Sequence, residues 1–400
     1  MEFDLTDEQR AFQQLAHAFA AGEIAPVAAD YDESGDYPWP VIHRAFDAGL
    51  MYVNVPSRWG GGGVSLLDEC IIQEELAWGC VGIAGALTIS NIPALGVILA
   101  GTEEQGRRFL GGQIERRAVA CYALSEPGAG SDVRAIRSRA RRIGGEYAIS
   151  GTKCFISSAD AASHMLLFAY TDPDLGHRGI SAFWLPTDRA GVRVGPPEKK
   201  MGQQASHIAS IFLDDVKAEA AERLGGEGSG FKLAMEVFNR SRPTIAIGAV
   251  GVARRAMELA VGYANERRAM GVPIIEHEAI GFMLADMDIR IAAARHLTYE
   301  AAWLVDQGRP NSVQAARAKC FAADMCMGVT TDAVQVFGGY GYMREYPVEK
   351  LMRDAKVIQI YEGTTQIQRL IIARSMMTRR PASSPEPPLP VPEVGHAPPG

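Results

Sequence analysis

Residues 335–369 read QVFGGYGYMREYPVEKLMRDAKVIQIYEGTTQIQR, and the rest of the chain is best interpreted outward from this stretch. It begins with Gly338, Gly339 and Gly341, where the backbone can bend sharply or approach a ligand closely. It then passes through a charged segment and an apolar run that ends at one carboxylate, Glu362. A carboxylate at the end of an apolar run is a candidate for acid–base chemistry.

The neighbours of Glu362 suit a base that removes a proton from a substrate. Ile360 and Tyr361 would desolvate the carboxylate and raise its pKa toward the working pH. Thr364–Thr365 would cap a helix that continues to about Met377. The alternative is that Glu362 only complements the positive end of that helix. The residues alone leave both interpretations open.

The same residues resemble a known family. IYEGTTQIQR, with RDAK upstream and FGGYGY before it, is similar to the C-terminal signature of the acyl-CoA dehydrogenases. The motif is long, so a chance match is improbable. The resemblance implies that Glu362 is the base that removes the α-proton of an acyl thioester.

Composition and charge exclude several classes of protein. The chain has 400 residues, a formal net charge of −7 and 47% hydrophobic residues. This acidic balance argues against bulk binding of nucleic acid. The six cysteines show no CxxC pair and no metal-ligand spacing with histidine, so we expect buried, reduced thiols and no metal site.

The N-terminus, MEFDLTDEQRAF, is acidic and has neither an apolar signal core nor an Arg-rich leader. No run of about 18 apolar residues stands out, so no membrane span is expected. We therefore expect a cytoplasmic protein of bacterial type.

The first 117 residues are expected to form an N-terminal helical domain. Thr6 begins a capping box, and Val41–Ala48 and Ser65–Trp78 have helical patterns. Ile83–Leu99 is expected to be an apolar helix that carries a few polar residues, namely Thr88, Ser90 and Asn91. These could be satisfied core residues or part of a pocket wall, and both interpretations stay open.

From residue 118 to 230 the periodicity changes from 3.6 to 2, which predicts a middle antiparallel β domain. The expected strands are Ala118–Leu124, Ser138–Ile143, Tyr147–Ile156, Met165–Tyr170, Ile180–Leu185 and Ile208–Leu213. A glycine cluster at 225–230 ends this part, and the absence of a following GK[ST] argues against a phosphate-binding P-loop.

Residues 231–380 are expected to form a C-terminal four-helix bundle. Its helices would be Phe231–Ala269, Ile275–Gln307, Ser312–Phe337 and the helix after Glu362, with a shorter helix at Lys350–Lys356. Residues 381–400 are rich in proline and predict a disordered tail. The fold class is therefore α+β, and this order of helices, β domain and bundle also resembles the acyl-CoA dehydrogenases over residues 1 to about 378.

The segment YALSEPGAGSD at 122–132 can hold the edge of a flat heterocycle through backbone amides and hydroxyl groups. By itself it could be a simple turn. Because it matches the flavin-contacting segment of the family, the resemblance implies FAD as cofactor, and no GxGxxG supports a nicotinamide site instead. The residues assigned to FAD here are Tyr122, Leu124, Ser125, Gly130 and Ser131, with Ser131 also near the CoA pyrophosphate.

The strand KCFISS at 153–158 resembles a second flavin-contacting motif of the family. Phe155 takes the place of the aromatic residue that covers the flavin, and Ser157 that of a threonine near its reactive edge. Ile156 lies between them and is assigned to the same contact. A Phe keeps a stacking face but lacks the N–H of the usual Trp.

Other FAD contacts are expected from a neighbouring subunit. Arg267 matches the arginine that reaches the FAD pyrophosphate, and Arg suits phosphate because its fork donates two hydrogen bonds. Gln335, Gly338 and Gly339 match the segment at the adenosine half. The resemblance therefore implies a homotetramer, or at least a dimer. Thr364 and Gln366 match further FAD contacts in sequence positions after the base.

The segment FNRSR at 238–242 resembles the substrate motif of the family. Arg242 would help to hold the CoA part and orient the Glu362 loop, Asn239 replaces the usual Asp, and Gly363 is assigned to the substrate site. Some branches of the family place the base where Ser241 stands. Since serine cannot act as that carboxylate, Glu362 is the candidate base.

The sequence therefore predicts an FAD-dependent acyl-CoA dehydrogenase that forms a trans-2-enoyl-CoA and passes electrons to an electron-transferring flavoprotein. Two alternatives remain. The acyl group could arrive on an acyl carrier protein in a biosynthetic pathway, or the chain could be a flavin-fold protein that binds without catalysis.

Overall fold

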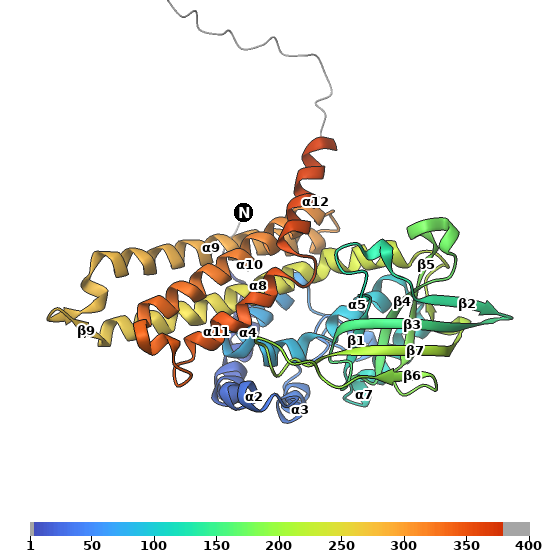
Figure 1. Cartoon of the computed structure of the whole chain (residues 1–400), viewed down its shortest axis with the longest axis horizontal. Coiled ribbons are helices and arrows are strands. Elements are labelled where there is room, and N and C mark those ends of the chain that lie inside the picture. The colour runs from blue at the N-terminus through green and yellow to red at the C-terminus, as the bar shows by residue number, and fades with distance from the viewer. Residues whose placement is uncertain (1–3, 379–400) are drawn as a thin grey trace, which may run out of the picture.

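A computed structural model describes residues 4–378 of the chain. In Figure 1 a helical bundle occupies one end of the molecule and a β-sheet the other, with the N-terminal helices packed along both. The predicted tail, residues 381–400, lies outside the described residues.

The N-terminal part is helical, as predicted. The helices are α1 (Asp7–Phe19), α2 (Ala28–Ser34), α3 (Trp39–Asp47), α4 (Leu66–Thr88), α5 (Asn91–Ala100), α6 (Glu103–Gln105) and α7 (Gly112–Glu115). The predicted capping box is confirmed: Thr6 Oγ1 accepts from the N–H of Gln9 at 3.2 Å, and Gln9 Oε1 accepts from the N–H of Thr6 at 3.1 Å. These two bonds satisfy backbone donors at the start of α1.

The expectation of one helix over Ile83–Leu99 is wrong, because the chain breaks between α4 and α5. Ser90 lies at this break, and its buried Oγ accepts from the N–H of Ala120 at 3.0 Å. Asn91 donates through Nδ2 to Glu69 Oε1 at 2.9 Å, and Thr88 Oγ1 donates to the carbonyl of Ala84 at 2.9 Å. These bonds favour the core interpretation for Thr88 and Ser90, whereas the buried Oδ1 of Asn91 has no hydrogen-bond partner within residues 4–378.

Helix α4 is long and apolar enough to cross a bilayer by length and composition, and 94% of its most apolar stretch is buried inside the fold. Within residues 4–378 no other helix passes that test. A core helix of a folded protein has the same composition, so this feature is weak evidence for a membrane span.

The middle part forms one eight-stranded sheet in the order β6-β7-β3-β2-β4-β5-β8, with β1 beside β4. The strands are β1 (Ala120–Ala123), β2 (Arg139–Ile143), β3 (Glu146–Ser157), β4 (His164–Tyr170), β5 (Ile180–Pro186), β6 (Val192–Val194), β7 (Ile208–Glu219) and β8 (Arg223–Leu224). The six predicted strands correspond to β1–β5 and β7. The strands β6 and β8 were not predicted because they have only three and two residues.

The sheet is mixed, whereas the sequence predicts an antiparallel one. Most neighbours are antiparallel, but β1 pairs with β4 in parallel, and β2 meets β4 in parallel at Arg139 and Tyr170. The hairpin of β2 and β3 intervenes in the chain between β1 and β4, so β4 can return in the same direction as β1.

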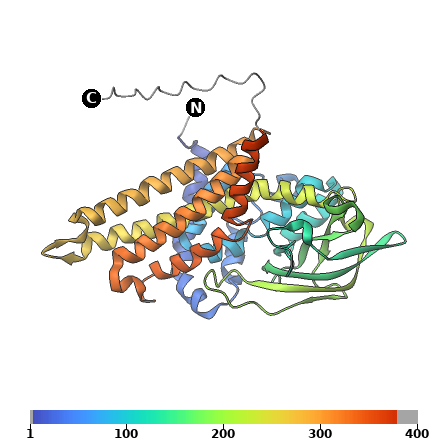
Figure 2. The ribbon, with the colours of Figure 1, turned by 45° about the horizontal axis from the view of Figure 1, so that its top comes forward.

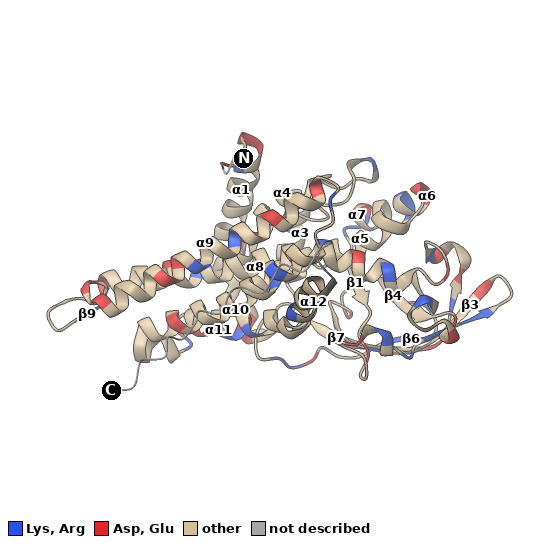
Figure 3. Cartoon of the chain, turned by 90° about the horizontal axis from the view of Figure 1, so that it is seen from above, with Lys and Arg blue, Asp and Glu red and all other residues tan. Residues whose placement is uncertain are grey.

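The C-terminal part contains the predicted long helices. They are α8 (Gly230–Glu266), α9 (Glu278–Asp306), α10 (Ser312–Phe337), α11 (Val348–Lys356) and α12 (Thr365–Thr378). A small hairpin of β9 (Arg268–Ala269) and β10 (Val272–Pro273) joins α8 to α9. Figure 2 shows α8, in yellow, running from the bundle into contact with the β-sheet region. Lys and Arg are interspersed with Asp and Glu over the face in Figure 3.

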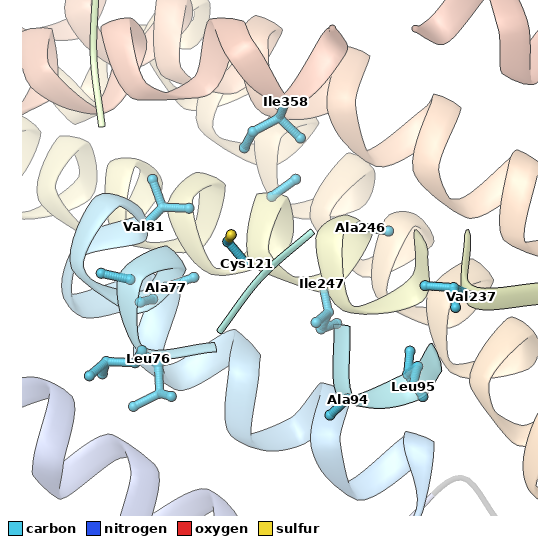
Figure 4. Close-up of a cluster of buried hydrophobic side chains, with 14 of the residues drawn as sticks. Leu76, Ala77, Val81, Ala94, Leu95, Cys121, Val237, Ala246, Ile247 and Ile358 are labelled. Atoms are coloured by element: carbon cyan, nitrogen blue, oxygen red, sulfur yellow. The ribbon is translucent and has the colours of Figure 1, made fainter. Parts of the chain in front are cut away.

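The three parts of the chain share one core. In Figure 4, Leu76 and Ala94 from the N-terminal helices, Cys121 from β1, Ile247 from α8 and Ile358 all belong to one buried cluster. The division of the chain at residues 117/118 and 230/231 stays a prediction.

The contact between α4 and α8 generates a stability prediction. A Cβ added at Gly251 would lie 2.2 Å from the carbonyl oxygen of Glu74, a backbone atom that cannot move aside cheaply. Gly251→Ala should therefore lower stability by about 1–3 kcal/mol, measured as a lower unfolding midpoint.

Gly262→Ala on the same helix is the matched control, since an added Cβ there meets nothing within 4 Å. It should be neutral or stabilise the protein by up to about 1 kcal/mol through helix propensity. Equal destabilisation by both variants would contradict the proposed packing constraint.

Candidate active site

Glu362 lies in a strained turn just before α12. Its φ is +56°, a left-handed conformation that residues other than glycine rarely adopt, and Gly363 follows with φ +87°. The Oγ of Ser241 on α8 donates to Glu362 Oε2 at 2.8 Å. The turn thus directs the carboxylate toward α8, where a hydroxyl fixes one of its oxygens.

Three side chains hold the carbonyl groups of this turn. Arg242 Nε donates to the carbonyl of Glu362 at 3.3 Å, and Gln368 Nε2 donates to the same carbonyl at 3.2 Å. Gln368 also reaches the carbonyl of Gly363 at 2.9 Å, and Lys319 Nζ donates to that oxygen at 2.8 Å. Donors from α8, α10 and α12 therefore maintain the strained conformation.

The site raises the pKa of Glu362 above its usual value. Burial is the main cause, because it disfavours the charged carboxylate. The hydrogen bond from Ser241 and the positive charges of Arg242 and Lys319 oppose this increase. A carboxylate with a raised pKa is a better proton acceptor once it is ionised.

Two hydrogen-bond donors at this site have no partner within residues 4–378. The hydroxyl of Tyr122 is buried and has no hydrogen-bond partner among the described residues. Burial and the nearby carboxylate of Glu362 raise the pKa of Tyr122, so its hydroxyl stays protonated. The backbone N–H of Glu362 also donates to no other group within residues 4–378. Buried donors in native proteins are normally satisfied, so the Tyr122 hydroxyl indicates a ligand site, and the N–H of Glu362 is a second donor that a ligand could meet.

The segment that includes Ser125, Gly130 and Ser131 is held by a buried ion pair. Lys153 Nζ on β3 donates to Glu126 Oε1 at 2.8 Å and to the carbonyl of Leu124 at 3.1 Å. Gly130 and Ser131 are exposed, and a Cβ added at Gly130 would meet no atom within 4 Å. The buried ion pair therefore holds the loop rigidly from beneath, and the exposed face of the loop is open to a cofactor.

The two predicted flavin segments lie together. The N–H of Cys154 donates to the carbonyl of Ser125 at 3.0 Å, which places Phe155, Ile156 and Ser157 beside the 122–131 loop. Phe155 has φ +56°, lies at an irregularity in the pairing of β3 with β7, and is 69% exposed. An exposed aromatic ring beside the serine-containing 122–131 loop suits stacking on a flat heterocycle.

The end of this segment is anchored to the N-terminal part. Tyr37 donates to Ser158 Oγ at 2.9 Å, and the N–H of Ser158 donates to the carbonyl of His207 at 2.7 Å. His207 itself bridges Asp160 Oδ2 at 2.6 Å and the carbonyl of Gly35 at 2.7 Å. These contacts fix the chain immediately after Ser157.

A cavity of about 420 Å³ lies at the other end of the bundle. It is lined by Arg267, Gly338 and Gly339, together with Tyr263, Phe337 and Tyr340. The adjoining β9 hairpin lies at the bundle end farthest from the β-sheet (Figure 1). Within one chain these residues are thus remote from the 122–131 loop. The cavity combines one arginine, which suits a phosphate, with the aromatic rings of Tyr263, Phe337 and Tyr340.

The remaining predicted residues have mixed environments. Thr364 Oγ1 accepts from the N–H of Ile367 at 3.2 Å, so the predicted cap of α12 is confirmed. Gln366 and Gln335 are exposed. The carbonyl of Asn239 accepts from Asn311 Nδ2 at 2.8 Å, which links α8 to the start of α10.

Lys319 and Gln368 were not predicted from the sequence, and Ser241 was considered only as an alternative base. Lys319 is fully buried within an alanine-rich face of α10. A lysine within the run AARAKCFAAD is the signal that could have identified it, because buried lysines are rare without a partner.

Comparisons with known proteins agree with this geometry. The chain matches the models described as acyl-CoA dehydrogenase N-terminal domain over residues 6–116, middle domain over 121–216 and C-terminal domain over 228–377. It is 43% identical over 378 residues to cyclohexane-1-carbonyl-CoA dehydrogenase of Geobacter metallireducens, covering 94% of this chain and 99% of the relative.

Solved structures give the same result. Butyryl-CoA dehydrogenase from Megasphaera elsdenii has a TM-score of 0.92 at 38% identity, covering 94% of this chain and 100% of that chain. A chain from a structure of the electron transferring flavoprotein of Acidaminococcus fermentans has a TM-score of 0.92 at 39% identity, with the same coverage. The prolyl acyl carrier protein oxidase AnaB is less similar, at 26% identity and a TM-score of 0.90, covering 93% of this chain and 100% of that chain.

The matched models span all three parts of the chain, and the relative from Geobacter covers nearly its whole length. The protein therefore belongs to the acyl-CoA dehydrogenase family and is an FAD-dependent enzyme of that family.

Proposed function

We propose that the protein removes two hydrogens from the α- and β-carbons of an acyl-CoA thioester and so forms the trans-2-enoyl-CoA. The observation that carries this proposal is the Glu362 carboxylate. It is half-buried and largely desolvated, oriented by Ser241 at 2.8 Å, and near the Tyr122 hydroxyl, which has no partner within residues 4–378. A desolvated, oriented carboxylate is what abstraction of a weakly acidic α-proton requires.

Glu362 takes the α-proton, and its free backbone N–H donates to the thioester oxygen, where negative charge develops. FAD, when bound, supplies the acceptor for the β-hydrogen and its electron pair. Phe155 and the 122–131 loop would hold that cofactor beside the base, and Arg242 keeps the Glu362 carbonyl in place at 3.3 Å. The substrate loses one proton and one hydride, so the product carries a new carbon–carbon double bond.

Glu362→Gln tests the assignment of the base. Gln is nearly isosteric and keeps the backbone N–H, but it cannot accept the α-proton. The variant should fold, retain FAD and bind acyl-CoA, while reduction of the cofactor by substrate falls by at least about 10²-fold in stopped-flow absorbance.

Glu8→Gln, at an exposed carboxylate on α1, serves as the control and should react at the normal rate. Near-normal reduction by Glu362→Gln would show that the base lies elsewhere and would remove the proposal.

We also propose that the protein assembles as a homotetramer, or at least a dimer. The cavity around Arg267 fits a phosphate-bearing group but is remote from the flavin loops of its own chain. A neighbouring chain could bring the two half-sites together. Large apolar side chains at Met270, Phe282 and Ile289, which are 95%, 66% and 64% exposed, support a further interface on this part of the bundle.

Arg267→Ala should weaken FAD binding by roughly 10- to 100-fold, the range expected for a lost charged hydrogen bond. Retention of FAD after gel filtration and the mass in light scattering measure the cofactor and the assembly together. Arg268→Ala is the matched control, because Arg268 Nη2 donates to Gly271 of its own hairpin at 2.6 Å. A monomer that retains FAD fully would contradict the proposed shared site.

The substrate carrier and electron acceptor are further parts of the proposal. We infer CoA thioesters as substrates and an electron-transferring flavoprotein as acceptor, supported by the names of the similar proteins. The similarity to a prolyl acyl carrier protein oxidase favours carrier-bound acyl groups as the second candidate. Matched CoA and carrier-protein thioesters should be compared by kcat/KM, and a preference for the carrier would select the second candidate.

A further inference from the structure

Lys319 is a buried cation whose role the reaction scheme above does not assign. It lies on α10, is fully buried, and donates through Nζ to the carbonyl of Gly363 at 2.8 Å. An ammonium group has three N–H donors, and burying its charge is costly unless a negative partner is near.

The ionisable groups around Lys319 come from several elements. Arg242 lies on α8, Cys320 and Asp324 on α10, and Glu362 in the turn. Asp324 already has two partners, since it accepts from Arg369 Nη2 at 2.6 Å and from Gln359 Nε2 at 2.7 Å. Tyr122 and Tyr361 also face Glu362, and burial raises the pKa of each, so both stay neutral.

Glu362 is the carboxylate next to the contact that Lys319 makes, since it directly precedes Gly363 in the turn. The positive charge of Lys319 opposes the effect of burial on the pKa of Glu362. Arg242 supplies a second positive charge on the side of α8. Two buried cations thus lie beside one half-buried carboxylate.

We propose that Lys319 is a positioning residue for the base: its ammonium group fixes the Gly363 carbonyl, and its positive charge beside the turn favours the ionised form of the Glu362 carboxylate. This inference rests on the proposed role of Glu362. The two functions of Lys319 are separable, because Gln368 holds the same carbonyl at 2.9 Å without carrying a charge.

The positive charge of Lys319 predicts the direction in which the pKa of Glu362 changes when that charge is removed. Removing a positive charge raises the pKa of Glu362, so the carboxylate forms only at higher pH. For Lys319→Gln, which keeps a donor but loses the charge, the midpoint of the pH–rate profile for cofactor reduction should rise by about one pH unit or more. The rate should fall at neutral pH and recover at alkaline pH.

Gln368→Leu is the matched control, because it removes a hydrogen bond to the same carbonyls without changing the charge. It should lower the rate by a similar factor at every pH and leave the midpoint unchanged. Lys319→Arg keeps the charge and should also retain the normal midpoint. This variant keeps the inference testable if Lys319→Gln does not fold, since a raised midpoint in Lys319→Arg would overturn it.

Infrared difference spectroscopy gives a readout that does not depend on activity. The carboxyl band that Glu362→Gln removes should titrate at higher pH in Lys319→Gln than in the unmodified holoenzyme. An unshifted band would overturn the role of the charge, even if the rate falls. If the band shifts while Glu362→Gln still reduces its cofactor normally, the electrostatic inference stands and the proposed base is wrong.

Discussion

The hydrogen bond from Ser241 to Glu362 joins the longest helix of the bundle to the turn before its last helix. The turn is strained, since Glu362 has φ +56°, and such strain persists only where the surrounding structure enforces it. Here Arg242, Lys319 and Gln368 enforce it from three helices. The bundle therefore acts as a frame that holds one carboxylate in one orientation.

The same frame determines the chemistry of the carboxylate. Burial raises the pKa of Glu362, while the buried charges of Arg242 and Lys319 lower it. Each cation is itself costly to bury, and burial lowers the pKa of Lys319 to about 8. Burial and the two cations thus act on the pKa of Glu362 in opposite directions, and the cations are charged residues in the middle of a helical core.

The cofactor half of the site uses a similar construction at the sheet. The buried pair of Lys153 and Glu126 supports the loop that carries Ser125, and the hydrogen bond from Cys154 ties Phe155 to that loop. Arg267, by contrast, lies at the far end of the bundle. The hydrogen bonds within one chain thus organise the base and the flavin-facing loops, while an arginine-lined cavity remains on the outer end of the bundle.

The sequence by itself determined the features that depend on residues close together in the chain. Capping by Thr6 and Thr364, the long bundle helices and six strands follow from local hydrogen bonds and from the period of apolar residues. The family was also recognisable, because short contiguous motifs such as IYEGTTQIQR carry the resemblance, and the same motifs led to the predicted base and flavin contacts.

Only the tertiary structure decided which distant residues meet. The parallel pairing of β1 with β4 depends on how the intervening hairpin folds back, and the hydroxyl of Ser90 meets the N–H of Ala120, 30 positions later. Lys319 is 43 positions before Glu362 in the sequence, yet its ammonium group holds the carbonyl of Gly363, the residue after Glu362. Local patterns cannot encode such contacts, because they arise when separate helices pack and bury their polar groups against one another.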